Sequence, residues 1–187
     1  MRRAHSLSLL AALAAALLPA AVAAAPSARE RIEALLSHYE RQPSREALLA
    51  ITPEAERVLQ DMIQRPSMRV LARTRAIAML RLFPSTRTAA VLRETVQVSA
   101  RASGGVAFLD LKAALSSYAA VAGPASIDLI QPFLAHSSMD VRYAAVASLA
   151  SVRSPRVAPL LEARRRVETS PMVRHHLERE LTRLRAR

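Results

Sequence analysis

The sequence predicts an all-α protein, a short α-solenoid of antiparallel helix hairpins, and three observations support this fold class. Aromatic residues make up 3% of the 187 residues and only three are glycine, so a β-sheet protein would lack core aromatics and turn residues. Alanine, leucine and arginine, which are strong helix formers, are abundant. One apolar pattern also recurs at intervals of 39, 30 and 32 residues.

The first 25 residues show the order of features of a secretory signal peptide. Arg2 and Arg3 give a positive start, residues 7–18 form an uncharged run rich in leucine and alanine, and Pro19 ends that run. Small residues follow, and Ala21-Val22-Ala23 fits the pattern that signal peptidase cleaves. We therefore expect cleavage near Ala23–Ala25, and export to the periplasm or the extracellular space.

The alternative is an uncleaved membrane anchor, because the apolar run from Leu7 to Ala25 approaches the ~20 residues that span a bilayer. Pro19 and the alanine-rich end of the run favour cleavage. No other apolar run predicts a span, so we expect no membrane span after cleavage.

The formal net charge of +12 falls to +10 without Arg2 and Arg3, because 25 bases then face 15 acids. All bases except Lys112 are arginine, which is typical of GC-rich bacterial codon usage. Acids lie among the arginines, as in Glu178-Arg179-Glu180, and this favours solvated helix faces over a nucleic-acid surface. We expect no nucleic-acid partner. The absence of cysteine excludes disulfides, thiolate metal ligands and a cysteine nucleophile.

Prolines divide the chain into blocks with the length of single helices. Several follow a residue suited to a helix N-cap, as in Thr52-Pro53, Ser154-Pro155 and Ser170-Pro171. Ser27 and Glu30 have the spacing of a capping box. We interpret residues 26–66 as an N-terminal helical cap, with helices expected over 28–41, 45–50 and 54–64.

Four basic residues share one apolar pattern and serve as anchors of the repeat: Arg73, Lys112, Arg142 and Arg174. The residues one before and three, seven and ten after each anchor are apolar in all four copies, and this spacing draws one stripe along a helix. The stripe residues are Ala72, Ala76, Leu80, Phe83, Leu111, Leu115, Ala119, Ala122, Val141, Ala145, Leu149, Val152, Val173, Leu177, Leu181 and Leu184.

A second apolar helix is expected after three of the anchor helices, over 86–97, 126–135 and 156–167. Two helices per unit indicate a repeat array over residues 67–187, about three units and a final capping helix at 171–184 that lacks a second helix. We place the extra residues of the longest interval in the loop at Ser103-Gly104-Gly105. Pro132 and Pro159 are expected to shorten or kink their helices.

Residues 139–149, Met-Asp-Val-Arg-Tyr-Ala-Ala-Val-Ala-Ser-Leu, resemble the first helix of a HEAT repeat, a family that favours Asp, then Val-Arg, then alanines leading to leucine. Residues 171–174 are similar, 111–115 are a looser copy, and Arg73 fits by spacing alone. The short period resembles the PBS-lyase HEAT-like subclass. The resemblance covers about residues 68–184, with TPR or another helical repeat as the alternative.

The HEAT resemblance implies a structural role for the anchors. Each anchor base would bond the aspartate of the motif, which is Asp140 in the clearest copy, or a backbone carbonyl of a neighbouring unit.

We find no pattern of a catalytic or metal site, and expect no enzyme, cofactor or bound metal. His175 and His176 are adjacent and point about 100° apart on a helix, so they cannot chelate one ion as an i,i+4 pair would. His175-x-x-Glu178 has the i,i+3 spacing of some metal sites, but it is a single copy without further ligands.

The expected function is an exported protein-interaction scaffold whose second helices line a concave groove. Candidate partner-binding residues are Arg87, Arg93, Arg165 and Arg166, which suit an acidic protein segment or an anionic envelope component. The run 164–166 would also fit a solvated helix end. The alternative function is a small envelope enzyme or ligand-binding protein, which buried polar residues in a closed pocket would favour. Uncovered alanine-rich faces would favour self-association.

Overall fold

The computed structural model describes residues 25–38, 42–65, 67–102 and 104–186. The predicted signal peptide lies outside these residues, apart from Ala25. The described chain contains helices and no strand, which confirms the all-α, solenoid-like fold. Its elements are α1 (Ala28–Ser37), α2 (Arg45–Leu49), α3 (Ala55–Ile63), α4 (Val70–Met79), η1 (Leu80–Leu82), α5 (Thr86–Arg101), α6 (Gly105–Ala122), η2 (Gly123–Ser126), α7 (Ile127–Ile130), η3 (Gln131–Ala135), α8 (Met139–Ser151), α9 (Val157–Val167) and α10 (Pro171–Arg185).

The capping box expected at Ser27 and Glu30 is confirmed. The Glu30 amide donates to Ser27 Oγ at 3.3 Å, and the Ser27 amide donates to Glu30 Oε2 at 2.7 Å. Pro171 is the first residue of α10, with Ser170 as the N-cap residue before it. Each of these pairs satisfies or avoids free N–H groups at a helix start. The same prediction is wrong for Thr52-Pro53 and Ser154-Pro155, because α3 begins at Ala55 and α9 at Val157, two residues after each proline.

The two internal prolines of the second helices behave differently. Pro132 shortens its helix as expected: α7 ends at Ile130 and the chain continues as the 3-10 helix η3. Pro159 does not, and that prediction is wrong: α9 runs from Val157 to Val167 without interruption. Pro159 is the third residue of α9, and a residue in the first turn has no carbonyl partner for its N–H to lose.

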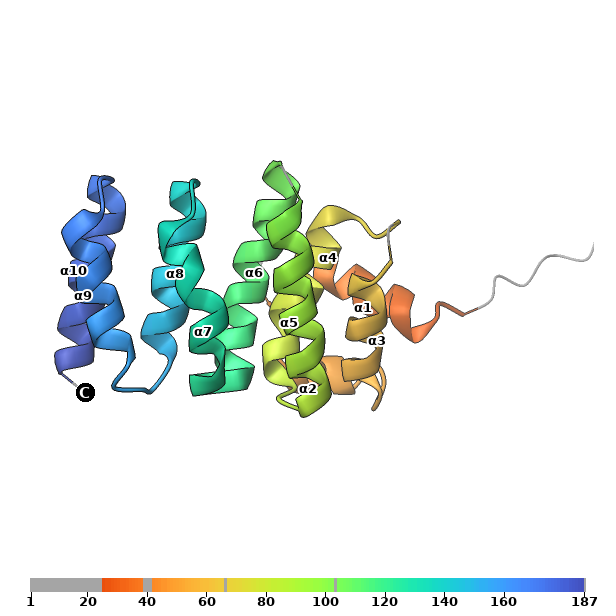
Figure 1. Cartoon of the computed structure of the whole chain (residues 1–187). Helices are drawn as coiled ribbons and strands as arrows, with labels where there is room; N and C mark the ends of the chain where they lie inside the picture. The colour runs from red at the N-terminus through yellow and green to blue at the C-terminus, as the bar shows by residue number, and fades with distance from the viewer. Residues whose placement is uncertain (1–24, 39–41, 66, 103, 187) are drawn as a thin grey trace, which may run out of the picture.

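The four anchor helices α4, α6, α8 and α10 contact one another in order along the stack (Figure 1). Between the anchor helices lie the other helices, and α4, α6 and α8 each pack more closely on the one that precedes them in the chain than on the one that follows. With α10, which packs on α9, this gives the pairs α3–α4, α5–α6, η3–α8 and α9–α10. The predicted pairing of each anchor helix with the following helix is therefore wrong by one helix. For the same reason α10 is not a single capping helix, because it packs against α9 as well as α8.

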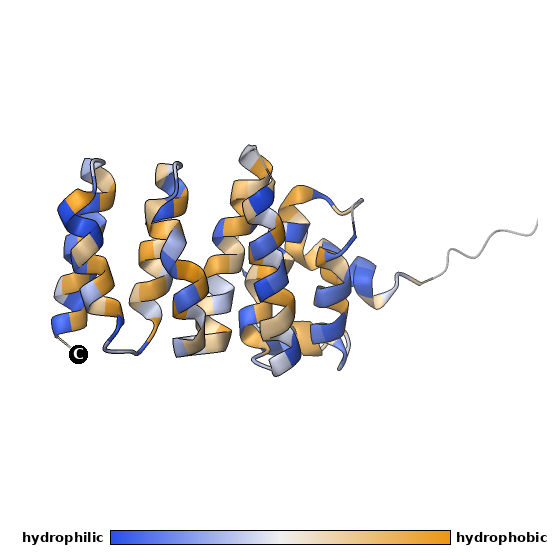
Figure 2. Cartoon of the chain, in the orientation of Figure 1, coloured by the Kyte–Doolittle hydropathy of each residue, from blue (hydrophilic) through white to orange (hydrophobic). Residues whose placement is uncertain are grey.

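The apolar stripe forms the centre of the core. All of its residues are buried except Ala122 and Leu184, which are partly exposed. Small side chains such as Ala76 and Ala145 lie beside larger ones in the same cluster, which lets the anchor helices pack closely. Figure 2 shows apolar and polar residues on the same helices, as expected for helices buried on one side.

The extra residues of the longest interval between anchors lie in longer helices. The prediction that they lie in the loop at residues 103–105 is therefore wrong. Helix α5 has 16 residues and α6 has 18, whereas α8 has 13 and α9 has 11. The chain between α5 and α6 spans only residues 102–104. The α5–α6 hairpin therefore extends further than its neighbours at the end where its loop lies.

Among the residues that the structure describes, one stretch, Gly105–Ala135, is long and apolar enough to cross a membrane by length and composition alone. In the fold it is not one helix: α6 ends at Ala122, and Gly123 takes a φ of +54° that directs the chain into η2 and α7. Leu111 and Leu115 of this stretch are fully buried in the core. The absence of a membrane span after signal cleavage stays a prediction.

Candidate functional site

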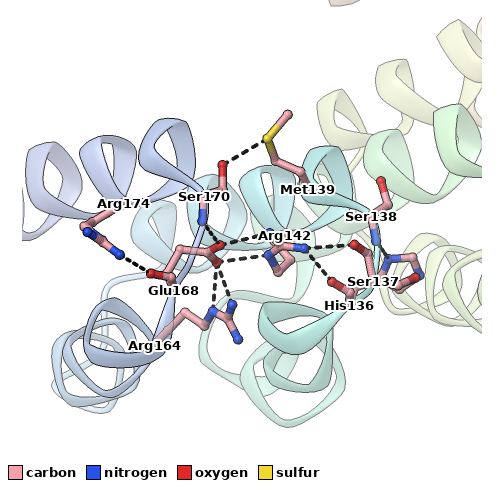
Figure 3. Close-up of polar contacts among 9 residues, drawn as sticks. All are labelled: His136, Ser137, Ser138, Met139, Arg142, Arg164, Glu168, Ser170 and Arg174. Atoms are coloured by element: carbon pink, nitrogen blue, oxygen red, sulfur yellow. Dashed lines mark hydrogen bonds and ion pairs between the residues drawn. The ribbon is translucent and has the colours of Figure 1, made fainter.

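Arg142 forms the most extensive polar contacts of the four anchors (Figure 3). From α8, its Nη1 donates to the carbonyl oxygens of His136 and Ser137, both at 2.9 Å. Its Nε and Nη2 donate to the two carboxylate oxygens of Glu168 at 3.0 and 2.9 Å. The bidentate geometry matches the fork of a guanidinium to a carboxylate, and joins α8 to the linker between α9 and α10.

Glu168 also accepts hydrogen bonds from α9, from α10 and from the linker between them. Arg164 of α9 donates to Oε2 at 2.7 and 3.0 Å, and the Ser170 amide donates to Oε1 at 2.9 Å. The backbone carbonyl of Glu168 accepts from Arg174 Nη2 at 2.6 Å. Glu168 is 1% exposed, so this buried carboxylate connects α8, α9 and α10.

Burial by itself would raise the pKa of Glu168, because it disfavours the charged form. Hydrogen bonds from Arg142, the Ser170 amide and Arg164 outweigh that effect and lower the pKa to about 2. The carboxylate therefore stays ionised between two arginines at any physiological pH. This cluster stabilises the fold rather than reacting with a substrate.

The HEAT resemblance left an aspartate or a backbone carbonyl as the partner of each anchor, and it did not indicate Glu168. Asp140, the aspartate implied by the HEAT resemblance, is exposed and bonds no residue that the structure describes. Arg142 does bond backbone carbonyls, as the resemblance also implied, and Arg174 bonds a carbonyl six residues before it as Arg142 does. Glu168 stands six residues before Arg174, as His136 stands before Arg142, but it is the only acid at this position of the repeat, so no recurring pattern marks it.

Arg73 forms a second contact between neighbouring anchor helices. Its Nη2 lies 2.5 Å from Asp110 Oδ2 on α6, and Thr74 Oγ1 donates to Asp110 Oδ1 at 2.5 Å. Asp110 precedes Lys112 by two residues, as Asp140 precedes Arg142, and this matching position could have revealed it. Lys112 itself is half-buried and has no ion pair or hydrogen bond within the described chain.

A cleft of about 510 Å³ lies between α4 and α5, two consecutive helices that make few contacts with each other. Arg73 and the 4% exposed Asp110 line it with Glu94, while apolar and uncharged polar residues form the remaining wall. Val98 and Ser99, from the last turn of the long α5, contribute to that wall. The last turn of the longest-spaced hairpin, α5–α6, thus forms part of the cleft.

The four arginines predicted to bind a partner do not come together. Arg87 and Arg93 lie on α5, and Arg165 and Arg166 lie on α9, with another hairpin between them (Figure 1). Arg93 donates to Tyr118 Oη at 3.0 and 3.1 Å. The Nε of Arg165 donates to Glu162 at 3.1 Å. Arg87 and Arg166 are exposed.

A second hollow, of about 590 Å³, lies between the second helices η3 and α9. Pro132, Leu134 and Leu160 give it an apolar floor. Arg164 lines it too, but that side chain is already bound to Glu168. We call this hollow the η3–α9 groove.

His176 is the most buried histidine among the described residues, and its ring stacks on Tyr143 of α8 at a centroid distance of 3.8 Å. Burial lowers its pKa, Glu180 acts in the opposite direction, and Arg179 lowers it further. Nε2 is buried without a hydrogen-bond partner. Within the described chain no group of three or more His, Asp or Glu residues could hold a metal ion.

The packed helix pairs define the class of protein, an α-solenoid. Residues 111–182, from α6 to α10, match the family model for HEAT repeats, which supports a HEAT-repeat protein. The match includes Lys112, Arg142 and Arg174 but not Arg73, whose helix resembles the repeat by spacing alone. Comparisons with curated proteins and with solved structures give no match.

Proposed function

We propose that this protein is an exported, non-enzymatic interaction module that binds a protein segment on the face of its second helices. The η3–α9 groove carries the proposal, because it is a hollow between two second helices within the part that matches HEAT repeats. HEAT repeats are commonly protein-interaction scaffolds.

The lining of the η3–α9 groove indicates the chemistry of the partner. Its floor is apolar, because Pro132 and Leu134 of η3 and Leu160 of α9 form it. The two charged residues that line it already have partners, because Arg164 bonds Glu168 and Asp128 pairs with Arg156. A segment carrying one or two apolar side chains therefore suits the groove better than a strongly acidic one.

Site-specific photocrosslinking tests this face. A photoreactive residue at Ala163, which is exposed and lines the groove, should crosslink to an envelope protein in cells that produce the chain. The matched control is Ala90, which is exposed on α5 and does not line the groove. Equal crosslinking from both positions, or none from Ala163, would count against the groove.

Charge reversals separate this proposal from a basic groove. If apolar contacts dominate, Leu160→Glu abolishes the Ala163 crosslink while Arg93→Glu and Arg165→Glu leave it intact. If either Arg93→Glu or Arg165→Glu abolished the crosslink, the result would support the basic binding surface predicted from the sequence.

The export part of the proposal rests on the first 25 residues. The intact mass of the chain recovered from the cell envelope should correspond to a protein that begins between residues 24 and 26. Recovery of the full-length chain from the membrane fraction would instead support the uncleaved anchor.

A second candidate function is the binding of a small ligand in the cleft between α4 and α5. The buried Asp110 and the partly buried Arg73 in its lining favour this candidate, although the cleft is open on one side. Native mass spectrometry of the protein purified from the envelope tests it. A bound molecule that is lost in Ala102→Trp, which narrows the cleft, would support this function, and a ligand-free protein would oppose it.

A further inference from the structure

The large apolar side chains left exposed in the described chain gather along one edge of the stack, which we call the apolar edge. They belong to the first turns of α4, α8 and α10, to the first two turns of α6, and to the last turns of α5 and α9. They are Val70, Leu71, Val98, Val106, Leu109, Met139, Val167 and Met172.

Contacts between neighbouring hairpins place these helix ends side by side. Near the start of α4 and α6, Arg73 pairs with Asp110 at 2.5 Å. At the next junction, Phe108 of α6 meets His136, just before α8, at a ring-centroid distance of 5.4 Å. At the last junction, the hydroxyl of Ser170, just before α10, donates to the sulfur of Met139, the first residue of α8, at 3.0 Å (Figure 3). The apolar edge is the upper edge of the stack in Figure 1.

At the opposite edge of the stack, large apolar side chains at the helix ends are buried. Their exposure at the apolar edge is therefore not a general property of helix ends in this fold. There the chain turns from each anchor helix into the next second helix. The large apolar residues at two of those turns, Phe83 and Val152, are buried at 5% and 2% exposure.

Exposed charge on the apolar edge is mostly positive. The exposed arginines in its linkers and terminal turns are Arg65, Arg69, Arg101, Arg166 and Arg174, and the exposed acids there are Asp61 and Asp140. One of these arginines, Arg69, also contacts Glu33 at 3.3 Å. The N-termini of the four anchor helices add positive potential at the same edge.

We propose that the apolar edge rests on an anionic lipid surface, with its apolar side chains in the interface and its arginines among the phosphate headgroups. This inference goes beyond the proposed function, because it uses another partner and a surface that shares only Val167 with the lining of the η3–α9 groove. The apolar side chains are spread over four hairpins and do not form one compact patch. A fluid lipid layer can accept each of them separately, whereas a protein partner would need a matching row.

Vesicle flotation tests the proposal with the chain that begins at Pro26, so that the predicted signal peptide does not contribute. Every buried residue of the described core lies after this position. The protein should float with vesicles that contain phosphatidylglycerol and much less with phosphatidylcholine vesicles. High salt should weaken the binding, because it screens the arginines.

Two variants and one control assign the binding to this edge. Leu109→Ser/Met172→Ser removes two exposed apolar side chains and should lower the partition coefficient about tenfold or more. Arg166→Glu should lower it about tenfold. Arg153→Glu makes the same charge change at the opposite edge and should bind nearly as well as the wild type. Circular dichroism checks that all three remain folded.

Three results would overturn the proposal: no binding to anionic vesicles, equal binding of wild type and the double variant, or an equal effect of Arg153→Glu and Arg166→Glu. A protein partner on this edge would give the first result. The groove crosslink from Ala163 does not depend on lipid, so the two proposals fail separately.

Discussion

Replacing Glu168 with glutamine keeps the shape of the side chain and removes its charge. Arg142 and Arg164, whose side chains are 11% and 15% exposed, would then lie in the fold without their counterion. Removing one partner of a buried ion pair is costly, because the remaining charge has lost its water and receives little in exchange. The linker between α9 and α10 would lose the group that ties it to α8.

The magnitude follows from the pKa of Glu168. Lowering the pKa from 4.5 to about 2 makes the ionised form about 3 kcal/mol more stabilising in the folded state than in the unfolded state. Breaking a buried pair costs roughly 3–5 kcal/mol, so the two estimates agree. Because the folded pKa is depressed, this stabilisation is complete well above pH 4.5 and is lost as the pH falls from 4.5 towards 2.

Urea unfolding followed by circular dichroism measures the effect. Glu168→Gln should lower the free energy of unfolding by about 3 kcal/mol at pH 7, and the difference from wild type should shrink to about 1 kcal/mol at pH 3. The control is Asp128→Asn, which alters the exposed ion pair with Arg156 and should leave the unfolding midpoint nearly unchanged. A wild-type-like Glu168→Gln at pH 7, or a difference that does not depend on pH, would refute this account of the cluster.

Three further changes test neighbouring features. Arg142→Lys keeps the charge but loses the bidentate contact with Glu168, so it should lower the free energy of unfolding in urea by about 2 kcal/mol. An unchanged unfolding midpoint would mean that the positive charge alone is sufficient. Burial lowers the pKa of His176 in the folded state, so as the pH falls the unfolded state takes up a proton on this histidine at a higher pH than the folded state does. The free energy of unfolding should therefore fall as the pH drops below 6.5. His176→Phe keeps the stacking on Tyr143 and should lose less stability than wild type between pH 7.5 and 5.5, and an equal loss would exclude His176 as the source. Gly123→Ala forces a side chain into a φ of +54° and should cost about 1–2 kcal/mol by thermal unfolding, with a wild-type midpoint contradicting the strain.

Features that depend on local geometry could be predicted from the sequence. The capping box at Ser27 and the buried stripe from Ala72 to Leu184 follow from spacing along one helix, which every segment carries by itself. The same spacing identified Arg142 and Arg174 as equivalent positions, and both do bond backbone carbonyls six residues earlier.

Features that depend on contacts between segments were decided only by the tertiary structure. Helical periodicity says which side of a helix is apolar but not which neighbour covers it, so the pairing of each anchor helix with the preceding helix could not be read. Glu168 becomes the counterion of Arg142 only because the α9–α10 linker passes α8, and Asp140 is left in solvent. The scattered arginines and the gathered apolar edge have the same cause: the stacking of hairpins determines which residues, distant in the chain, share a surface.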